Sequence, residues 1–548
     1  MSTTPPPPVS HSLQPTGTPI HTRSGTTHRY DSRYENRFTV LTRLANEMGP
    51  FVVGPIAPEV FLDLFLPPPP PPPPPTGSSV PSGMFDRYFE VLDENETRWY
   101  NVFVSSDDHV LCLLLGLTLP FQIEIISPLV KKLALVNTSN AKKEQPSNKF
   151  PFDMVPDCSV YMDKKGKKLD FSCLDFIIEF KRLDPFCEPV AVNDPGSSAN
   201  NPDAAKNPFL CSNSDKRVIL GQLTAYASMI LSSQYRTHVF MVLIVKKYAR
   251  LIRWDRGGAV VTGPIPFADQ PHLHDFLIRY DIADPEARGH DSTVGLPTND
   301  EITCAKASVP ELSGAESFLA VTISDHQSSN RYIISSPESR PLIPVGRWTR
   351  PSVAFDTQNR RHVLLKDSWR VLLDDIKPEG EIYRLLHENS VPNIPSCLVA
   401  GDVGNDAYHR SQTHEVMDKH VARHPCWTLT PHRHYRIVLG LVGRRLEKFD
   451  RTFEVVNAMS AALVGKMLIF LAISQRNLTH IVAHEAAFKI GILHRDISVG
   501  NILIVGPKEL DDSEDPHKSE INGGMLIDWD LSSIVGNTTA RQHTRTVG

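Results

Sequence analysis

Residues 491–505 read G-I-L-H-R-D-I-S-V-G-N-I-L-I-V, and residues 523–530 read G-G-M-L-I-D-W-D. In the first stretch the carboxylate Asp496 stands five residues before the amide Asn501, and an apolar run of strand type follows. In the second stretch another apolar run delivers the carboxylate Asp528. Two such runs separated by a polar segment predict a hairpin, which would bring Asp528 beside Asn501.

These side chains suit phosphoryl transfer. One carboxylate can orient an attacking hydroxyl and accept its proton, while an amide and a second carboxylate can hold Mg²⁺ on the phosphates. The spacing H-R-D-x-x-x-x-N puts His494, Arg495 and Asp496 at one end of a short loop and Asn501 at the other. Two ordinary buried strands with polar ends are the alternative, but the joint spacing and strand context favour a phosphate site.

The same motifs resemble the fungal-type protein kinase family, a group of eukaryotic-like kinases of mushroom-forming fungi. The pattern H-R-D-I-S-x-G-N-I-L and L-I-D-W-D matches almost letter for letter, with Trp529-Asp530 where ordinary kinases have Phe-Gly. The resemblance implies an α+β fold with a bilobal kinase-like domain, ATP and Mg²⁺ as cofactors, and a serine/threonine protein substrate. It implies Asp496 as the base and Asn501 and Asp528 as the Mg²⁺ ligands.

A small lobe is expected before these motifs. An apolar strand ends at Lys366 and is followed by D-S-W, which matches the family's phosphate-binding lysine better than a surface lysine. Its helix partner is predicted to be Glu381, with Glu379 as the second candidate. Gly346 stands where a phosphate loop belongs, although Trp348 replaces the second glycine of the family pattern.

The resemblance reaches upstream to about residue 40, and residues 541–548 resemble the start of the family's activation segment. No A-P-E-like anchor follows, so we expect a truncated large lobe. Two other function classes stay open: a non-catalytic ATP-binding pseudokinase or scaffold, favoured by the truncation and by Trp348, and a small-molecule kinase. Arg495 favours a protein kinase, because an arginine there can bind a phosphorylated activation segment.

A histidine-rich stretch, residues 409–434, precedes the expected hinge strand. Its histidine spacing fits no standard zinc pattern. We therefore expect an exposed polar insertion rather than a metal site.

The N-terminal half carries a second motif. Asp157 follows a proline, and Glu179-x-Lys181 ends an apolar strand, which resembles the P-D…(D/E)-x-K pattern of restriction-nuclease-like domains. In that pattern two acids hold Mg²⁺ and the lysine steadies the attacking water. Gln222 and Tyr226 are expected to share one helix face. Because both short motifs are common in α/β domains, a domain without nuclease activity is the favoured alternative.

Composition sets the remaining bounds. The chain has 548 residues and a net charge of −5, which argues against nucleic acid as a partner. Its eight cysteines lack paired spacing, which favours reduced thiols in an intracellular protein, cytoplasmic or nuclear. The apolar run Val110–Leu119 is too short to span a bilayer.

Composition shifts divide the chain into five parts. The proline run Pro67–Pro75 favours a stiff spacer, with docking on a proline-binding domain of a partner as the alternative. The expected parts are a disordered Pro/Ser/Thr-rich tail (1–35), an apolar segment with the polyproline spacer (36–84), a mixed α/β domain (85–284), a linker (285–325) and the truncated kinase-like domain (326–548).

Overall fold

The computed structural model describes residues 36–68, 89, 92–93, 99, 132–139, 141, 154–162, 169–187, 207–324, 329–335, 343–374, 376–404, 407–421, 427, 429–463, 483–506 and 523–535. The predicted disordered tail, most of the proline run, and the activation-segment residues 541–548 lie outside the described residues.

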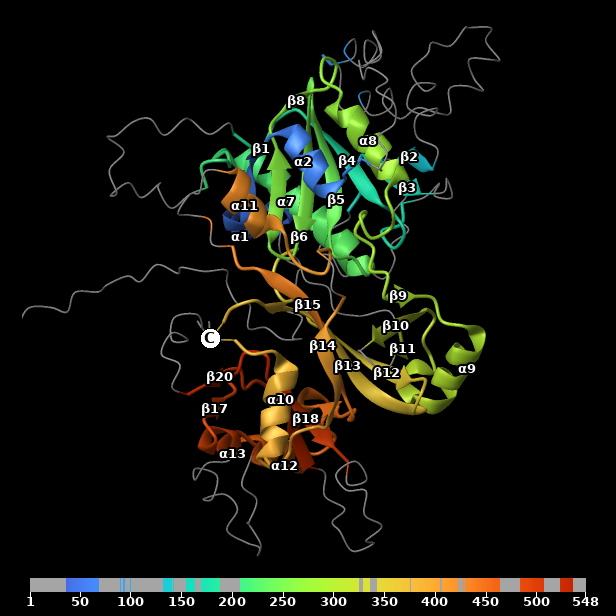
Figure 1. Cartoon of the computed structure of the whole chain (residues 1–548), viewed down its shortest axis with the longest axis vertical. Helices are drawn as coiled ribbons and strands as arrows, with labels where there is room; N and C mark the ends of the chain where they lie inside the picture. The colour runs from blue at the N-terminus through green and yellow to red at the C-terminus, as the bar shows by residue number, and fades with distance from the viewer. Residues whose placement is uncertain are drawn as a thin grey trace, which may run out of the picture.

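The first body is a mixed sheet with helices on both faces (Figure 1). Its strands are arranged in the order β1-β7-β6-β5-β4-β3-β2, and β4 pairs with β5 in parallel. The elements are α1 (Arg37–Met48), η1 (Gly49–Phe51), β1 (Val52–Ile56), α2 (Pro58–Phe65), β2 (Leu133–Asn137), β3 (Cys158–Met162), β4 (Phe176–Lys181), α7 (Ser214–Ser233), β5 (Val239–Val245), β6 (Tyr248–Asp255), β7 (Gly258–Thr262), β8 (Ile265–Pro266) and α8 (His272–Ile282).

Strand β5 shows why this sheet needs two covered faces. Its seven residues, V-F-M-V-L-I-V, are all buried. Val239 and Met241 point into the core beneath α1 and α7, while Phe240 packs with α2 and α8 on the other face. A continuous apolar run is therefore expected here, because side chains alternate between two buried faces.

The second body contains the kinase motifs and a sheet with the strand order β14-β15-β13-β12-β11-β10-β9. The elements are β9 (Val294–Gly295), α9 (Asn299–Ser308), η3 (Pro310–Leu312), β10 (Phe318–Ser324), β11 (Ser329–Ser335), β12 (Arg350–Asp356), β13 (Arg361–Val371), α10 (Glu379–Glu388), β14 (Cys397–Asp402), α11 (Thr413–His420) and β15 (His432–Leu439).

In the described residues, the rest of the second body consists of short strands and the helices α12 and α13. The elements are β16 (Arg444–Arg445), η4 (Leu446–Lys448), α12 (Thr452–Leu463), α13 (Ala483–Lys489), β17 (Ile492–Leu493), η6 (Val499–Asn501), β18 (Ile502–Val505), β19 (Gly523–Leu526) and β20 (Ser533–Ile534). Strands β18 and β19 pair antiparallel, with Ile502 opposite Leu526, so they form the predicted hairpin.

The segment 285–325, predicted to be a linker, is ordered. It contains α9, η3 and the whole of β9 and β10, and the two strands extend the kinase sheet at one edge. Thr298 and Glu301 form a capping box at the start of α9. Residues of α9, η3 and β10 also form an apolar cluster with Ile333 and Phe355 of the neighbouring strands, which makes the segment part of the fold.

The prediction of an exposed histidine-rich insertion is wrong for part of the stretch, because His409, His432 and His434 are buried while His420 is exposed. The chain between β14 and β15 leaves the kinase sheet, and α11 packs against β1 and β7 of the first body (Figure 1). There Asp255 accepts hydrogen bonds from the backbone N–H groups of Gln412 at 2.7 Å and Thr413 at 3.2 Å. His409 and His434 are 2% and 3% exposed because the two bodies enclose them.

A disulfide joins Cys187 to Cys211, so the prediction of reduced thiols is wrong at these two positions. The β-bridge between Phe186 and Leu210 brings the cysteines together, which their spacing did not reveal.

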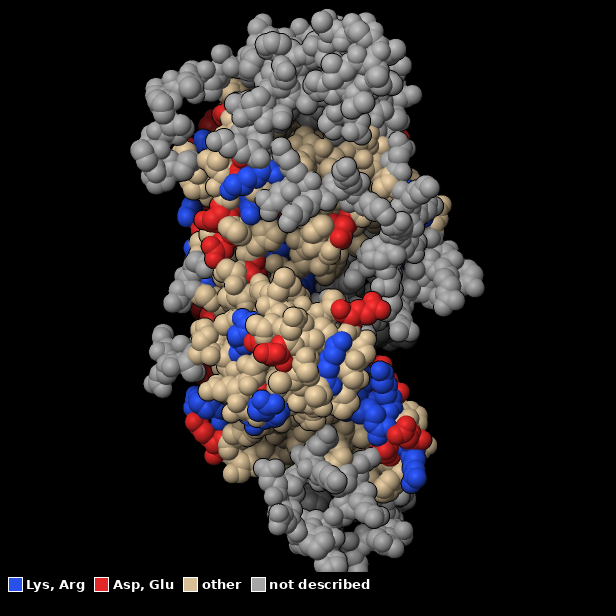
Figure 2. Space-filling view, turned by 90° about the vertical axis from the view of Figure 1, so that its right-hand side faces the viewer, with Lys and Arg blue, Asp and Glu red and all other residues tan. Residues whose placement is uncertain are grey.

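In the described part of the chain, every helix falls short of the length or apolar character that a membrane crossing needs. Lys, Arg, Asp and Glu side chains are interspersed on the described surface that Figure 2 shows.

Candidate functional site

Lys366 lies at the centre of the site, on β13. Its Nζ donates to Glu379 Oε2 at 2.8 Å, contacts Asp528, and lies 3.4 Å from Asp530 Oδ2. Burial disfavours the ammonium charge, but these carboxylates, Asp528 first, raise the lysine pKa above its ordinary value. The predicted strand lysine is thus held in its charged form within an acidic cluster.

Glu379, rather than the predicted Glu381, is the helix partner of Lys366. Helix α10 buries Glu379, Ile382 and Leu386 on one face, while Glu381 is partly exposed and ion-paired with Lys377. The i, i+3, i+7 spacing from Glu379 could have identified the correct residue. The other Glu379 oxygen accepts the Trp529 N–H at 3.1 Å, which ties α10 to the end of the hairpin.

Three carboxylates meet beside the lysine. Glu379, Asp528 and Asp530 each offer an oxygen within 4.8 Å of the others. Burial opposes ionisation of Asp528, but Lys366 and Arg347 hold its pKa well below the usual range, whereas burial raises the pKa of Asp530. Clustered carboxylate oxygens are the donors that Mg²⁺ prefers, so these residues fit that cation. Asp530 was missed as a site residue.

Asp528 has a backbone φ of 68°. The left-handed region is uncommon for a residue with a side chain and is favoured at sites where the surroundings fix it. The next residue, Trp529, is fully buried and its Nε1 donates to the Leu526 carbonyl at 3.2 Å. The buried indole therefore anchors the turn that directs both aspartates toward Lys366.

The loop with the H-R-D motif lies next to this turn. His494 Nε2 is 2.9 Å from the Ile527 carbonyl, and its Nδ1 accepts the Asp496 N–H at 3.3 Å. Burial lowers the pKa of His494 to about 4, so the ring is neutral with its proton on Nε2. The Asn501 Nδ2 donates to the Asp496 carbonyl at 2.8 Å. His494 is a positioning residue that joins the two halves of the site.

Asp496 itself is half-buried. Burial, and then the neighbouring charge of Asp528, raise its pKa from the usual carboxyl value. The preceding residue, Arg495, has a φ of 69°, so the loop turns sharply just before the candidate base. A raised carboxyl pKa beside a carboxylate cluster fits the chemistry of a candidate general base.

The predicted role of Gly346 in phosphate binding does not match its geometry. Its N–H donates to the Arg256 carbonyl of the first body at 3.0 Å. Trp348 is buried, with its Nε1 donating to the Ile343 carbonyl at 2.7 Å. Between them Arg347 extends into the acidic cluster and ion-pairs with Asp530. Sequence reasoning missed Arg347.

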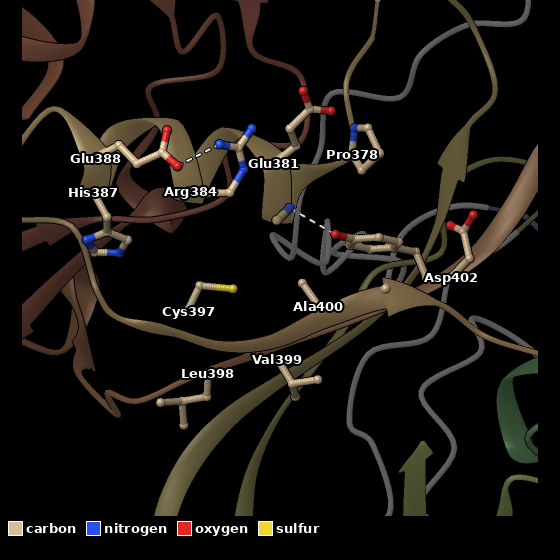
Figure 3. Close-up of a pocket in the computed structure, with 13 residues that line it drawn as sticks. Pro378, Glu381, Arg384, His387, Glu388, Cys397, Leu398, Val399, Ala400 and Asp402 are labelled. Carbon is tan, nitrogen blue, oxygen red and sulfur yellow. Dashed lines mark hydrogen bonds and ion pairs between the residues drawn. The ribbon is translucent and has the colours of Figure 1, made fainter. Parts of the chain in front are cut away.

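A pocket of about 580 Å³ lies between α10 and β14, outside the acidic cluster (Figure 3). Glu381, Arg384 and Glu388 line it from the helix, and Arg384 pairs with Glu388 at 2.6 Å. At one end the Tyr435 hydroxyl accepts the Gly380 N–H at 2.9 Å. The pocket thus contacts the same helix that supplies Glu379, on a different face.

The predicted N-terminal motif also assembles. Lys181 Nζ lies 2.6 Å from Glu179 Oε1 and 3.7 Å from Asp157 Oδ2. Gln222 Nε2 donates to the same Glu179 oxygen at 2.8 Å and contacts the Tyr226 hydroxyl at 2.9 Å. Burial raises the pKa of Glu179 and of Asp157. Asp157 lies just before β3, Glu179 and Lys181 lie on β4, and Gln222 and Tyr226 lie on α7.

A third polar cluster joins the two bodies. The Nδ1 atoms of His409 and His434 are 2.9 Å apart, and His434 Nε2 lies 2.9 Å from Asp367 Oδ2. Asp291 could share a metal ion with both histidines, but Arg436 Nη2 already donates to it at 2.7 Å. Each ring thus has hydrogen-bonding partners without a cation, and the cluster is explained as a structural network.

In comparisons with known proteins, no curated protein matches the chain. The family model described as fungal protein kinase matches residues 209–548, which is more than half of the chain. The match starts inside the first body rather than near residue 40, and it includes every residue of the acidic cluster. The chain therefore belongs to the fungal protein kinase family.

Proposed function

We propose that the chain is an ATP- and Mg²⁺-dependent protein kinase acting on serine or threonine. The observation that carries this proposal is the simultaneous contact of Lys366 with Glu379 and Asp528. A strand lysine that joins a helix glutamate to a metal-binding aspartate is the arrangement that positions nucleotide phosphates. Family membership supports the same activity.

Each residue has a distinct role in the proposed reaction. Lys366 binds the nucleotide phosphates, and Asp496 orients the substrate hydroxyl and accepts its proton. Asn501 and Asp528 would hold Mg²⁺, with Asp530 as a further carboxylate beside Asp528, and the ion when bound neutralises charge on the phosphates. Arg495 favours a protein substrate over a small molecule, because an arginine in this loop can pair with a phosphorylated segment of chain.

Calorimetric titration of Mg²⁺-ATP tests the binding half of this proposal. We expect Lys366→Ala and Asp528→Ala to weaken nucleotide binding, while Lys377→Ala, which removes a surface ion pair, leaves it unchanged. Equal nucleotide affinity in wild type, Lys366→Ala and Asp528→Ala would exclude this nucleotide site.

Radiolabelled ATP tests the transfer half. If the chain transfers phosphate to protein, Asp496→Asn should abolish transfer while nucleotide affinity persists, because the base acts on the hydroxyl and not on ATP. Nucleotide binding without any transfer, in wild type as in Asp496→Asn, would favour the pseudokinase or scaffold alternative.

The first body supports a second candidate function, Mg²⁺-dependent cleavage of a phosphodiester. The specific observation is the contact of Lys181 with both Asp157 and Glu179. Two acids beside one lysine can hold a cation and steady an attacking water.

Incubation of the protein with plasmid DNA and Mg²⁺ tests this second candidate. We expect the wild type to cleave the DNA and Glu179→Gln not to cleave it. Absence of cleavage by the wild type contradicts this candidate and leaves the kinase proposal intact.

A further inference from the structure

The side chain of Arg347 extends from the loop between Gly346 and Trp348 into the cluster of Glu379, Asp528 and Asp530. Its guanidinium ion-pairs with Asp530, and its side chain is buried with only 6% exposed. Asp530 is also 3.4 Å from Lys366. A cation that binds the Glu379, Asp528 and Asp530 oxygens would therefore meet a like charge beside Asp530.

The backbone of Arg347 is fixed on both sides. Its carbonyl accepts the Trp369 N–H at 2.7 Å, which continues the pairing of β12 with β13. The preceding Gly346 N–H donates to Arg256. Because these bonds hold the main chain, a change of partner by Arg347 requires movement of its side chain alone.

Arg256 supplies the anchor from the first body. It lies in the turn between β6 and β7, and its guanidinium is 3.8 Å from the centroid of the Trp348 ring. Its Nη1 donates to the Pro344 carbonyl at 3.3 Å, and its own carbonyl accepts the Gly346 N–H at 3.0 Å. One residue of the first body thus contacts the loop on both sides of Arg347.

We propose, resting on the proposed kinase function, that Arg347 competes with metal ions for Asp530. Its guanidinium neutralises Asp530 in the nucleotide-free protein and moves to the phosphates when Mg²⁺-nucleotide binds. A guanidinium forms paired hydrogen bonds with carboxylate and with phosphate alike, so the two partners compete for it. The free metal is then disfavoured, and the metal–nucleotide complex is favoured. Arg256 sets the position from which the side chain makes this exchange.

The test separates the two halves of the exchange. Mn²⁺ binding without nucleotide is followed by electron paramagnetic resonance, and Mg²⁺-ATP binding by calorimetry. We expect Arg347→Ala to bind Mn²⁺ about tenfold more tightly and Mg²⁺-ATP about tenfold more weakly, the size of one charged hydrogen bond. Arg347→Gln should shift both in the same directions by less, since it keeps a donor for Asp530.

The matched control is Arg370→Ala. Arg370 lies on β13, the strand that carries Lys366, and its bidentate ion pair with Asp402 lies outside the acidic cluster. It should change neither affinity. Arg256→Ala should tighten Mn²⁺ binding as Arg347→Ala does, by a smaller factor. A merely structural role of Arg347 would weaken both affinities together, and that result overturns the proposal.

Failure of the kinase proposal is distinguishable. A wild-type protein that binds no Mg²⁺-ATP overturns the kinase function and the transfer to phosphate. The Mn²⁺ titration then still decides whether Arg347 competes with the metal ion for Asp530. Equal Mn²⁺ affinity in wild type, Arg347→Gln and Arg347→Ala, all with native thermal transitions, shows that it does not.

Discussion

Glu379 and Glu381 are one residue apart but have opposite environments. Glu379 is 2% exposed and pairs with Lys366, whereas Glu381 pairs with Lys377 at the surface. We expect Glu379→Gln to weaken Mg²⁺-ATP binding about tenfold, because a buried charged hydrogen bond is lost. Glu381→Gln should leave the affinity within about twofold, as surface pairs contribute little. Titration calorimetry on both variants decides; a larger effect at Glu381 would restore the sequence-based assignment.

His494 predicts a pH dependence of stability. Burial lowers its pKa to about 4, while the unfolded chain has the ordinary value of about 6.5. Between these values the unfolded state binds more protons, so this contribution is complete above about pH 6.5 and is lost as the pH falls toward 4. The difference corresponds to about 3 kcal/mol.

The measurement is urea unfolding of wild type and His494→Gln at several pH values. We expect the wild type to lose stability more steeply than the variant between about pH 6.5 and pH 4. Parallel curves would mean that the ring is already protonated in the folded protein.

The sequence motifs predicted residues that the fold brings close to one another, and the residues that sequence reasoning missed have one cause. Lys366, Asp496, Asn501 and Asp528 belong to spaced motifs whose chemistry fixes the residue type. Arg347 acts through a contact with Asp530, which is 183 residues away in the chain. Such a contact leaves no local pattern, so only the fold reveals it.

Helices α1 and α7 depend on one small residue. A Cβ at Gly221 would lie 1.9 Å from the Leu41 carbonyl oxygen on α1. Because backbone cannot yield as a flexible side chain does, Gly221→Ala should destabilise the protein by about 1–3 kcal/mol. Gly314→Ala is the control, since a Cβ there would meet nothing within 4 Å. Thermal denaturation should show a lower midpoint for Gly221→Ala alone; equal midpoints would contradict the close approach.

At the level of elements, the hairpin of β18 and β19 was predictable because two apolar runs flank one polar segment. The ordered segment 285–325 and the buried histidine-rich stretch were not. The first begins with a polar stretch that hides the apolar run of β10, and the second buries only some of its histidines, against elements from elsewhere in the chain. Local patterning indicates which residues avoid water and gives no information about such distant partners.

The two bodies share a polar interface centred on Asp255. Its carboxylate pairs with Arg253 at 2.7 Å and accepts hydrogen bonds from Gln412 and Thr413. Asp255→Ala would leave the arginine charge buried without its partner, which typically costs about 3–5 kcal/mol. Asp402→Ala, which breaks the more exposed pair with Arg370, should cost less than about 1 kcal/mol.

Scanning calorimetry should show one unfolding transition for both bodies, shifted to lower temperature in Asp255→Ala. Trp348 and Trp369 of the kinase body lie in the same apolar cluster as α1 and α7, so neither body has a core of its own at this boundary. Two separate transitions in the wild type would show that the bodies fold independently.

The register of the β18–β19 hairpin has a practical consequence for engineering. Ile502 opposite Leu526 fixes the two halves of the candidate site through the strands themselves, whatever the length of chain between Val505 and Gly523. Lengthening a connection costs only about 0.6 kcal/mol for each doubling. A fluorescent or affinity module inserted between these two residues should therefore leave the hairpin register unchanged and, under the proposed function, the nucleotide affinity as well.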